Sequence, residues 1–308
     1  MTVADIVVIG SLNMDIVAIA PRLPRPGETI LGTQFMKVAG GKGANQAYAA
    51  AMLGGNVAMI GRVGDDEHGR QLTNGLAAVG CDVSSVRSLD VATGVAVIVV
   101  GAAGQNSIVV VPGANGSYQP SEFQADQHRL ADAKLVMLQL EIPLATVMAA
   151  ARAAKSYGAT VILDPAPAPA TLAPELIGDV DILTPNESEA VRLTGGVAQE
   201  LSLDEARATA SQLLATGAKT VIIKLGSRGC LLARREERSL IPAPRVEAVD
   251  TTGAGDVFNG AFAVAHSEGA SLTEACRFAV RAASLAVTRH GAQSSVPNRA
   301  ELTTFYAE

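Results

Sequence analysis

Large aromatic side chains are scarce in this sequence. Tryptophan is absent, and aromatic residues supply only 3% of the 308 positions, although hydrophobic residues still make up 48%. The core must therefore be built mainly from Ala, Val, Leu and Ile. Such a mixture suits buried parallel strands covered by helices of small residues, which favours an α/β fold.

Cysteine and histidine are also few and widely spaced. The three cysteines, Cys81, Cys230 and Cys276, form no CxxC pair, and the four histidines show no paired metal spacing. We therefore expect reduced thiols packed as small apolar residues, no metal cluster and a cytoplasmic protein, because disulfides persist mainly in oxidising compartments.

Long basic runs and long apolar runs are both missing. The net charge is −6, and no run of Lys and Arg predicts binding to nucleic acid or to a membrane surface. Asp5 stands where a signal peptide carries positive charge, and Glu141, Pro143 and Arg152 interrupt the longest apolar region. A small molecule is the expected partner.

Short apolar runs alternate with helical patterns along most of the chain. Expected strands cover residues 6–10, 56–63, 134–140, 160–163, 181–183 and 220–224, and expected helices cover 67–79, 144–157, 187–194, 207–216, 256–266 and 272–288. This alternation predicts a doubly wound, mostly parallel sheet flanked by helices, within one domain of residues 1–308.

Two stretches depart from the alternation. Residues 16–38 are extended pieces punctuated by proline and glycine, and residues 93–111 form an extended pair around a turn at 101–104. We expect these segments to form a small separate sheet that acts as a lid over the site. A plain β-extension is the alternative.

Polar residues or glycine follow many of the predicted strands. They are Asn13, Asp15, Glu141, Asp164, Asn186 and Gly226. Ligands of open α/β sheets collect at the carboxyl ends of strands, so one crevice is expected there. An ordinary Asx turn is the alternative for Asn13 and Asp15.

The segment 249–260 combines a polar turn, two glycines and a carboxylate before an apolar helix. Gly253 and Gly255 let the backbone approach a ligand, and the helix start adds unpaired N–H donors and a positive dipole end. Beside this anion site, Asp256 would take the proton of an attacking hydroxyl. The alternative is a plain helix start at which Asp256 complements the dipole.

Seven segments together resemble the carbohydrate kinase family that holds ribokinases, fructokinases and adenosine kinase, with ribokinases the nearest match. They are residues 10–15, 40–46, 61–66, 112–115, 138–141, 184–187 and 250–256, in the order of the family. The resemblance covers nearly the whole chain and implies ATP-dependent phosphorylation of the 5-hydroxyl of D-ribose. Asp256 would be the base, and the backbone of Gly253, Ala254, Gly255 and Asp256 would form the anion hole. The alternatives are a kinase of fructose, deoxyribose or pseudouridine, or a sensor without activity on the same fold.

The resemblance also implies binding residues and ions. For the sugar it implies Asn13, Asp15, Gly41, Lys42, Asn45, Glu141 and Asp256, and for the nucleotide Asn186, Glu189, Lys224, Gly226, Ser227, Gly229 and Gly255. Mg²⁺ would be organised through water by Asn186 and Glu189, although Asn186 is also a good helix cap. K⁺ would be bound by Asp250, Thr252, Ala286, Arg289, Gly291 and Ser295, mostly through carbonyl oxygens, and two chains would form a homodimer through their lid strands.

Two positions depart from the family pattern. Asp164 stands where many ribokinases carry Asn, which would alter the electrostatics on the nucleotide side. Val280 stands where an Asn near the adenine is common, which would loosen selection of the base.

Overall fold

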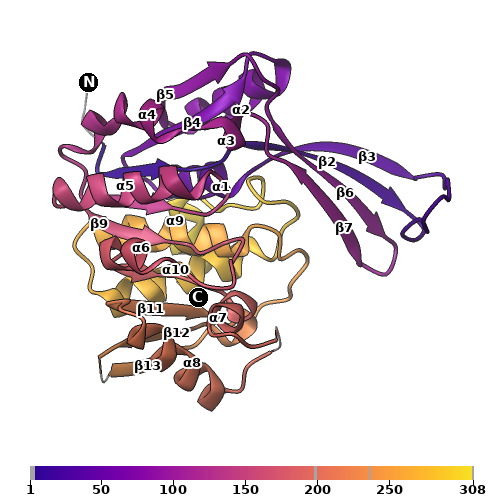
Figure 1. Cartoon of the computed structure of the whole chain (residues 1–308). Helices are drawn as coiled ribbons and strands as arrows, with labels where there is room; N and C mark the ends of the chain where they lie inside the picture. Colours follow the sequence, from indigo (N-terminus) through magenta and orange to yellow (C-terminus); the bar gives the residue numbers. More distant parts are fainter. Residues whose placement is uncertain (1–3, 198–199, 236, 307–308) are drawn as a thin grey trace.

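The computed structural model describes residues 4–197, 200–235 and 237–306. It contains a nine-stranded sheet and a separate four-stranded sheet. Figure 1 shows the larger sheet between two layers of helices and the smaller sheet projecting away from this body.

The larger sheet is mostly parallel. Its order is β13 (Glu237–Ile241), β12 (Cys230–Arg234), β11 (Thr220–Lys224), β10 (Ile182–Leu183), β9 (Thr160–Leu163), β8 (Leu135–Leu138), β1 (Ile6–Ile9), β4 (Val57–Gly64) and β5 (Asp82–Leu89). Within the described residues, its antiparallel pairings are those of β12 with β11 and with β13, at one edge of the sheet. All four residues of β1 are buried, which explains why the strand is a continuous apolar run instead of an alternating one.

The order in which the chain adds strands to the sheet reverses at β1. The chain runs from β1 to β4 and β5 on one side, and later returns to β8 on the other side of β1. The connections that leave β1 and β8 therefore diverge and open a crevice at the carboxyl ends of these strands.

Helices cover both faces of the larger sheet. Ile6 and Val8 face a core with α1 (Lys42–Met52), α2 (Glu67–Ala78), α9 (Ala254–Ser267) and α10 (Leu272–Ala286). Val7 and Ile9 face the opposite core with α4 (Pro120–Gln124), α5 (Leu144–Ser156), α6 (Pro174–Asp179), α7 (Glu187–Leu193) and α8 (Leu203–Ala215). The remaining elements are α3 (Ala114–Ser117), α11 (Arg299–Phe305) and the short turns η1 (Gln127–Leu130) and η2 (Gly226–Arg228).

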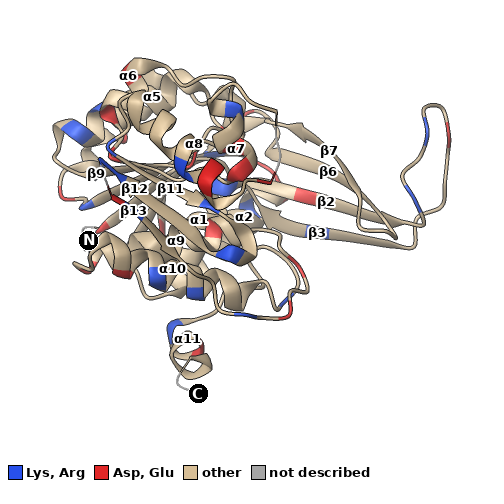
Figure 2. Ribbon diagram, turned by 90° about the horizontal axis from the view of Figure 1, so that it is seen from below, with Lys and Arg blue, Asp and Glu red and all other residues tan. Residues whose placement is uncertain are grey.

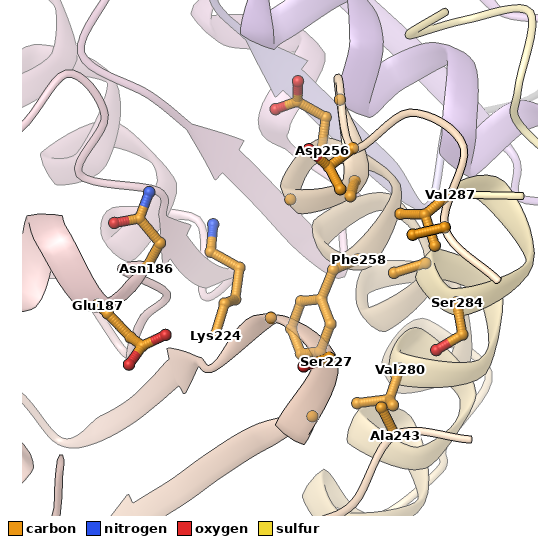
Figure 3. Close-up of a pocket in the computed structure, with 18 of the residues that line it drawn as sticks. Asn186, Glu187, Lys224, Ser227, Ala243, Asp256, Phe258, Val280, Ser284 and Val287 are labelled. Atoms are coloured by element: carbon orange, nitrogen blue, oxygen red, sulfur yellow. The ribbon is translucent and has the colours of Figure 1, made fainter. Parts of the chain in front are cut away.

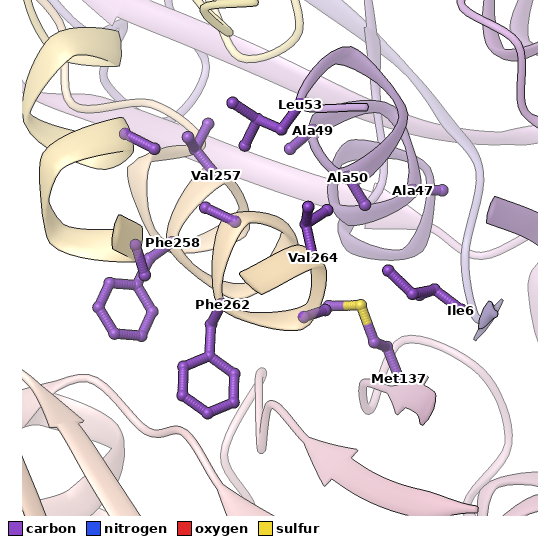
Figure 4. Close-up of a cluster of buried hydrophobic side chains, with 14 of the residues drawn as sticks. Ile6, Ala47, Ala49, Ala50, Leu53, Met137, Val257, Phe258, Phe262 and Val264 are labelled. Carbon is purple, nitrogen blue, oxygen red and sulfur yellow. The ribbon is translucent and has the colours of Figure 1, made fainter. Parts of the chain in front are cut away.

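Helix α9 lies at the centre of the first core. Residues 256–265 are all buried, and Figure 4 shows Phe258, Phe262 and Val264 of this helix near α1 and β8. A Cβ added at Gly260 would lie only 2.8 Å from Ala49 Cβ and from the Gln46 carbonyl oxygen, so the glycine allows the two helices to touch. This contact fixes the start of α9 relative to α1.

The smaller sheet has the order β3 (Gln34–Gly40), β2 (Asn13–Ala20), β6 (Gly94–Gly101) and β7 (Asn106–Val111). Its strands carry only two charged residues, Asp15 and Lys37, whereas the main body is densely charged (Figure 2). Apolar side chains on it are exposed, including Phe35 at 64% and Val109 at 61%. The prediction of a doubly wound, mostly parallel sheet with an additional small sheet is confirmed.

Several element boundaries differ from the expected ones. Helix α1 begins at Lys42, inside the glycine-rich segment, and α8 begins at Leu203 instead of residue 207 because Ser202 and Glu205 form a capping box. Strand β5 was not predicted, since its alternating polar sequence lies at the sheet edge and only one of its residues is fully buried. The three cysteines are free and buried, as predicted. No helix in the described ranges has both the length and the hydropathy to cross a membrane.

Candidate active site

A cavity of about 720 Å³ lies beside the start of α9. Figure 3 shows Asp256, Lys224 and Asn186 at its polar end, and Val280 and Val287 of the α10 region at its apolar end. The cavity is thus polar beside Asp256 and Lys224 and mostly apolar where α10 and the segment 243–248 line it, although Ser284 and Arg245 of these two elements also contribute to its wall.

Asp256 is buried with only 6% of its surface exposed. Its Oδ2 accepts a hydrogen bond from Asn45 Nδ2 at 3.1 Å and its Oδ1 accepts one from Gln46 Nε2 at 3.1 Å. The pKa of Asp256 is raised from 3.8 to about 6, mainly by burial and also by the charge of Asp164, while Lys42 and the two amides oppose the rise. Its carboxylate makes no capping hydrogen bond within α9, and as the acidic residue of the first turn Asp256 also complements the helix dipole, which is the role that its alternative gives it.

The turn before Asp256 lines the cavity with Gly253, Ala254 and Gly255. Gly253, the N-cap of α9, has a left-handed φ of 73°, which is favourable for glycine. Two of the expected donors take part in this turn, since Ala254 N–H donates to the Thr251 carbonyl and Asp256 N–H donates to the Gly253 carbonyl. A Cβ added at Gly255 would lie 3.4 Å from Lys224 Nζ, so an ammonium group faces the same helix start. Dipole and ammonium together favour an anion at this point.

Carboxylates gather on the other side of Asp256. Glu141 Oε2 accepts hydrogen bonds from Ser11 Oγ at 2.6 Å and from Lys42 N–H at 3.0 Å. Burial first, and then the nearby charges of Glu141 and Asp256, raise the pKa of Asp15 from 3.8 to about 6. Burial alone would lower the pKa of Lys42, but the carboxylates around it, Asp256 first, raise that pKa overall, so Lys42 stays an ammonium ion.

The remaining sugar-side residues lie at the junction between β1, β2 and α1. Asn13 and Asp15 lie on the extended strand β2 and not in an Asx turn, so their side chains point to the same face. Gly41 has a φ of 89°, and a Cβ there would lie 2.7 Å from the Asn13 nitrogen. The structure thus brings together all of the residues that were predicted to contact the sugar.

The residues predicted to bind the nucleotide line the cavity. They are Asn186, Glu189, Lys224, Gly226, Ser227, Gly229 and Gly255. Asn186 and Glu189 form the capping box of α7, with Glu189 N–H donating to Asn186 Oδ1 at 2.8 Å and Asn186 N–H donating to Glu189 Oε2 at 2.7 Å. Asn186 therefore has the helix-cap role that was its alternative, while its side chain also lines the cavity.

Sequence reasoning missed the apolar end of the cavity and a buried amide. Phe258, Ala283 and Val287 line the cavity, but the sequence gives no sign of this because apolar helix residues usually pack in a core. Gln46 contacts Asp256 directly, and its only signal was its place beside Asn45 in the glycine-rich segment. Val280 lines the apolar end, which agrees with its predicted position near the adenine of the nucleotide.

The residues predicted to bind a monovalent cation lie on two adjoining loops and, for Ala286, at the end of α10. Asp250 connects them, because its Oδ2 accepts from Gly291 N–H at 2.8 Å while its Oδ1 accepts from Thr252 N–H and Oγ1. Burial opposes the charge of Asp250, but these hydrogen bonds lower its pKa overall. Arg289 N–H donates to the Ala286 carbonyl, and Ser295 Oγ donates to the Ala292 carbonyl.

Comparisons with known proteins decide the family. The family model described as pfkB family carbohydrate kinase matches residues 3–299. The chain belongs to this family of carbohydrate kinases. The prediction of the family is confirmed. Within the family, this carbohydrate kinase is 42% identical over 300 residues to a ribokinase of Haemophilus influenzae, with 97% of each chain covered.

Other relatives of this carbohydrate kinase are named as kinases of ribose or deoxyribose. A deoxyribokinase of Salmonella typhimurium is 38% identical over 295 residues, with 96% of each chain covered. The solved structure of a ribokinase of Arabidopsis thaliana, complexed with ribose and ATP, superposes with a TM-score of 0.91 at 39% identity and covers 98% of each chain.

Proposed function

We propose that this protein transfers the γ-phosphoryl group of ATP to the 5-hydroxyl of D-ribose and so gives D-ribose 5-phosphate. The observation that carries the proposal is the place of Asp256, a buried carboxylate between a cluster of sugar-type hydrogen-bonding groups and the start of helix α9. The full-length similarity to ribokinases supports the choice of sugar.

On the sugar side, Asn13, Asp15, Asn45 and Glu141 bind the ring hydroxyls, with Gly41 and Lys42 beside them. Carboxylates accept strongly from hydroxyl groups, and a polyol needs several converging partners. Asp256 takes the proton of the attacking hydroxyl as its oxygen approaches the phosphorus atom. Its raised pKa, about 6, matches this role because a base works best when its pKa lies near the operating pH.

On the nucleotide side, the apolar end of the cavity receives the base and the polar end receives the phosphates. Lys224 and the start of α9, with Ala254, Gly255 and Asp256, face the negative charge of the transferring group. Phosphoryl transfer needs little covalent help from the protein, so positioning and charge stabilisation account for most of the rate increase.

Mg²⁺ and K⁺ are part of the proposal. Among the described residues, no group of three or more His, Cys, Asp and Glu forms a metal cage, which suits an ion bound mainly by substrate phosphates. Burial raises the pKa of Glu189 at the cavity wall, so a cation would relieve that carboxylate, and Mg²⁺ would neutralise phosphate charge there. Carbonyl oxygens of the loops that Asp250 connects, with Thr252, Ala286, Arg289, Gly291 and Ser295, would hold K⁺.

The small sheet is proposed to act as a lid and as the contact of a cytoplasmic homodimer, with no nucleic-acid or membrane partner. Asp15 of β2 already belongs to the sugar side, so the sheet completes the site. Its exposed apolar face, which includes Phe35, Val97 and Val109, would be covered by the same sheet of a second chain.

A kinase of 2-deoxyribose is the second candidate, since a deoxyribokinase is similar over nearly the full length. ATP consumption by the purified protein with Mg²⁺ separates the candidates, using ribose, deoxyribose, fructose, pseudouridine and adenosine, each with K⁺ or Na⁺. The highest kcat/KM on ribose, lost in Asp256→Asn, is the expected result. A preference for another sugar overturns the choice of substrate, and no turnover on any of them supports the sensor alternative.

A further inference from the structure

A buried amide connects Asp256 to a second carboxylate. Gln46 of α1 is only 1% exposed, and its Nε2 donates to Asp256 Oδ1 at 3.1 Å and to Asp164 Oδ2 at 3.0 Å. Asp164, which follows β9, is itself only 2% exposed. Both N–H bonds of one amide group are therefore used on two carboxylates that little water reaches.

Gln139 fixes the orientation of this amide from behind. Gln139 follows β8 and is fully buried, and its Nε2 donates to Gln46 Oε1 at 2.8 Å. If the amide of Gln46 were turned over, its oxygen would face two carboxylates and its nitrogen would face another donor. Three hydrogen bonds would then be replaced by repulsive contacts, so only one orientation is stable.

Asp164 connects this arrangement to the nucleotide side. Its Oδ1 forms an ion pair with Lys224 Nζ at 2.9 Å. Both side chains are largely buried, since 3% of the Asp164 side chain and 12% of the Lys224 side chain are exposed. Lys224 Nζ also faces Gly255 at the start of α9. A continuous series of contacts thus runs from the phosphate end of the cavity through Lys224, Asp164 and Gln46 to Asp256.

Other charges also surround Asp256 and Asp164. They are Lys42 of α1, Asp15 of β2, Lys224 of β11 and Glu189 of α7. Burial is the main reason that the pKa of Asp256 is raised; Lys42 lowers it, Asp164 raises it, and the hydrogen bonds from Asn45 and Gln46 lower it. Asp164 and Gln46 therefore act on the same carboxylate in opposite directions.

We propose that Gln46 is a positioning residue that orients the Asp256 carboxylate through Oδ1 and couples it to the Asp164–Lys224 pair. Oδ2, to which Asn45 donates from the sugar side, is then the oxygen that accepts the hydroxyl proton with its second lone pair. The inference rests on the proposed function because it takes Asp256 as the base.

Two variants test this role through effects of opposite sign. Gln46→Met keeps the length of the side chain but removes the donor, so kcat should fall about 10-fold to 100-fold while the KM values for ribose and ATP change less than about 3-fold. The acidic limb of the kcat profile should move to higher pH, because the lost hydrogen bond stabilised the charged form. Asp164→Asn keeps the shape and removes a neighbouring negative charge, so the same limb should move to lower pH.

Asp181→Asn is the matched control. Asp181 also pairs with lysines, Lys155 and Lys219, but it lies at the amino-terminal end of β10, whereas the site lies at the carboxyl ends of the strands. This variant should keep the kcat and the pH profile of the unaltered protein.

The outcomes separate this inference from the proposed function. If the unaltered protein phosphorylates none of the sugars, both fail. If it is active and both Gln46→Met and Asp164→Asn keep its pH profile, only the coupling fails. Thermal unfolding reports whether the Gln46→Met variant is folded. If it is not folded, the Asp164→Asn variant decides the test. An acidic limb of its kcat profile that stays in place or moves to higher pH would overturn the inference.

Discussion

The side chain of Asn115 hydrogen-bonds both backbone groups of Leu12. Its Oδ1 accepts from Leu12 N–H at 3.0 Å, its Nδ2 donates to the Leu12 carbonyl at 2.9 Å, and Nδ2 also donates to Asn13 Oδ1 at 2.8 Å. Leu12 lies where the chain leaves the larger sheet for the smaller one, and Asn115 lies where it has just returned. One amide therefore fixes the base of the small sheet and the orientation of Asn13.

Asn115→Asp should weaken sugar binding selectively. The carboxylate cannot donate to the Leu12 carbonyl or to Asn13 Oδ1, so Asn13 loses its fixed orientation. We expect the KM for ribose to rise about 10-fold, with the KM for ATP changed less than about 3-fold, because hydrogen bonds are worth about 1 kcal/mol each and unsatisfied buried groups cost more. Asn74→Asp on the exposed surface of α2 is the control, and equal changes in both KM values would contradict the role.

Gly260→Ala should damage the contact between α9 and α1. The new methyl group would lie 2.8 Å from Ala49 Cβ and 2.9 Å from Ala50 N, and it has no flexible side chain to displace. We expect a loss of about 1–3 kcal/mol in the free energy of unfolding, together with a lower kcat because Asp256 shares this helix. In Gly75→Ala on α2 the added Cβ meets nothing within 4 Å, so that variant should be neutral or stabilised. Chemical denaturation of both variants checks the contrast.

Asp126→Asn should destabilise the protein without changing its sugar preference. Asp126 is fully buried and pairs with Arg62, which is 1% exposed, at 3.0 Å. Removing its carboxylate leaves the buried guanidinium of Arg62 with the more distant carboxylate of Glu122, at 3.9 Å, and breaking such a buried pair costs about 3–5 kcal/mol. Breaking the exposed pair of Arg70 and Asp65 by Arg70→Ala should cost less than about 1 kcal/mol. Similar midpoints of urea unfolding for the two variants would refute the difference.

Asp256→Asn should abolish activity and yet raise stability at neutral pH. Burial raises the pKa of Asp256 from 3.8 to about 6, so the folded state binds a proton more tightly than the unfolded state. For a carboxylate shifted upward, stability is lost as pH rises from the unfolded pKa through the folded one, here between about pH 4 and pH 6. The variant has a neutral amide at this position and avoids this loss. Its free energy of unfolding at pH 7 should therefore exceed that of the unaltered protein by about 1–3 kcal/mol. Thermal melts at pH 4 and pH 7 measure it, and equal gains at both pH values would contradict the explanation.

Val109→Glu should convert the proposed dimer into monomers. Val109 pairs with Val97 across β6 and β7, and both are exposed on the same face of the small sheet. A charge in the centre of a buried apolar contact is unfavourable, so light scattering after gel filtration should give the mass of one chain. Gln105→Glu at the exposed turn after β6 is the control, and a dimer that survives Val109→Glu would place the contact elsewhere.

The sequence predicts the elements whose pattern is local. Continuous apolar runs gave the buried strands, and the glycine pair before Asp256 gave the start of α9 within two residues. Strand β5 was not predicted because an edge strand keeps polar residues on its exposed side. The start of α8 at Leu203 was not predicted because its capping residues precede the apolar pattern.

Within the site, the sequence predicts the residue types better than their connections. Gln46 contacts Gln139, Asp164 and Asp256, which are 93, 118 and 210 positions away. Such contacts depend on how helices pack on the sheet, and periodicity along the chain carries no information about them. The resemblance to known kinases supplied the sugar and nucleotide residues, whereas the amide between two carboxylates required the folded structure.

The small sheet carries part of the proposed sugar site, whereas the groups proposed for phosphoryl transfer lie on the main body. Asp15 lies on the small sheet, whereas Asp256, Gln46 and Lys224 lie on the main body. Substitutions in the strands of the small sheet can therefore alter which sugar is accepted while the phosphoryl-transfer groups keep their places. The small sheet is therefore the rational starting point for engineering a kinase that accepts a different sugar.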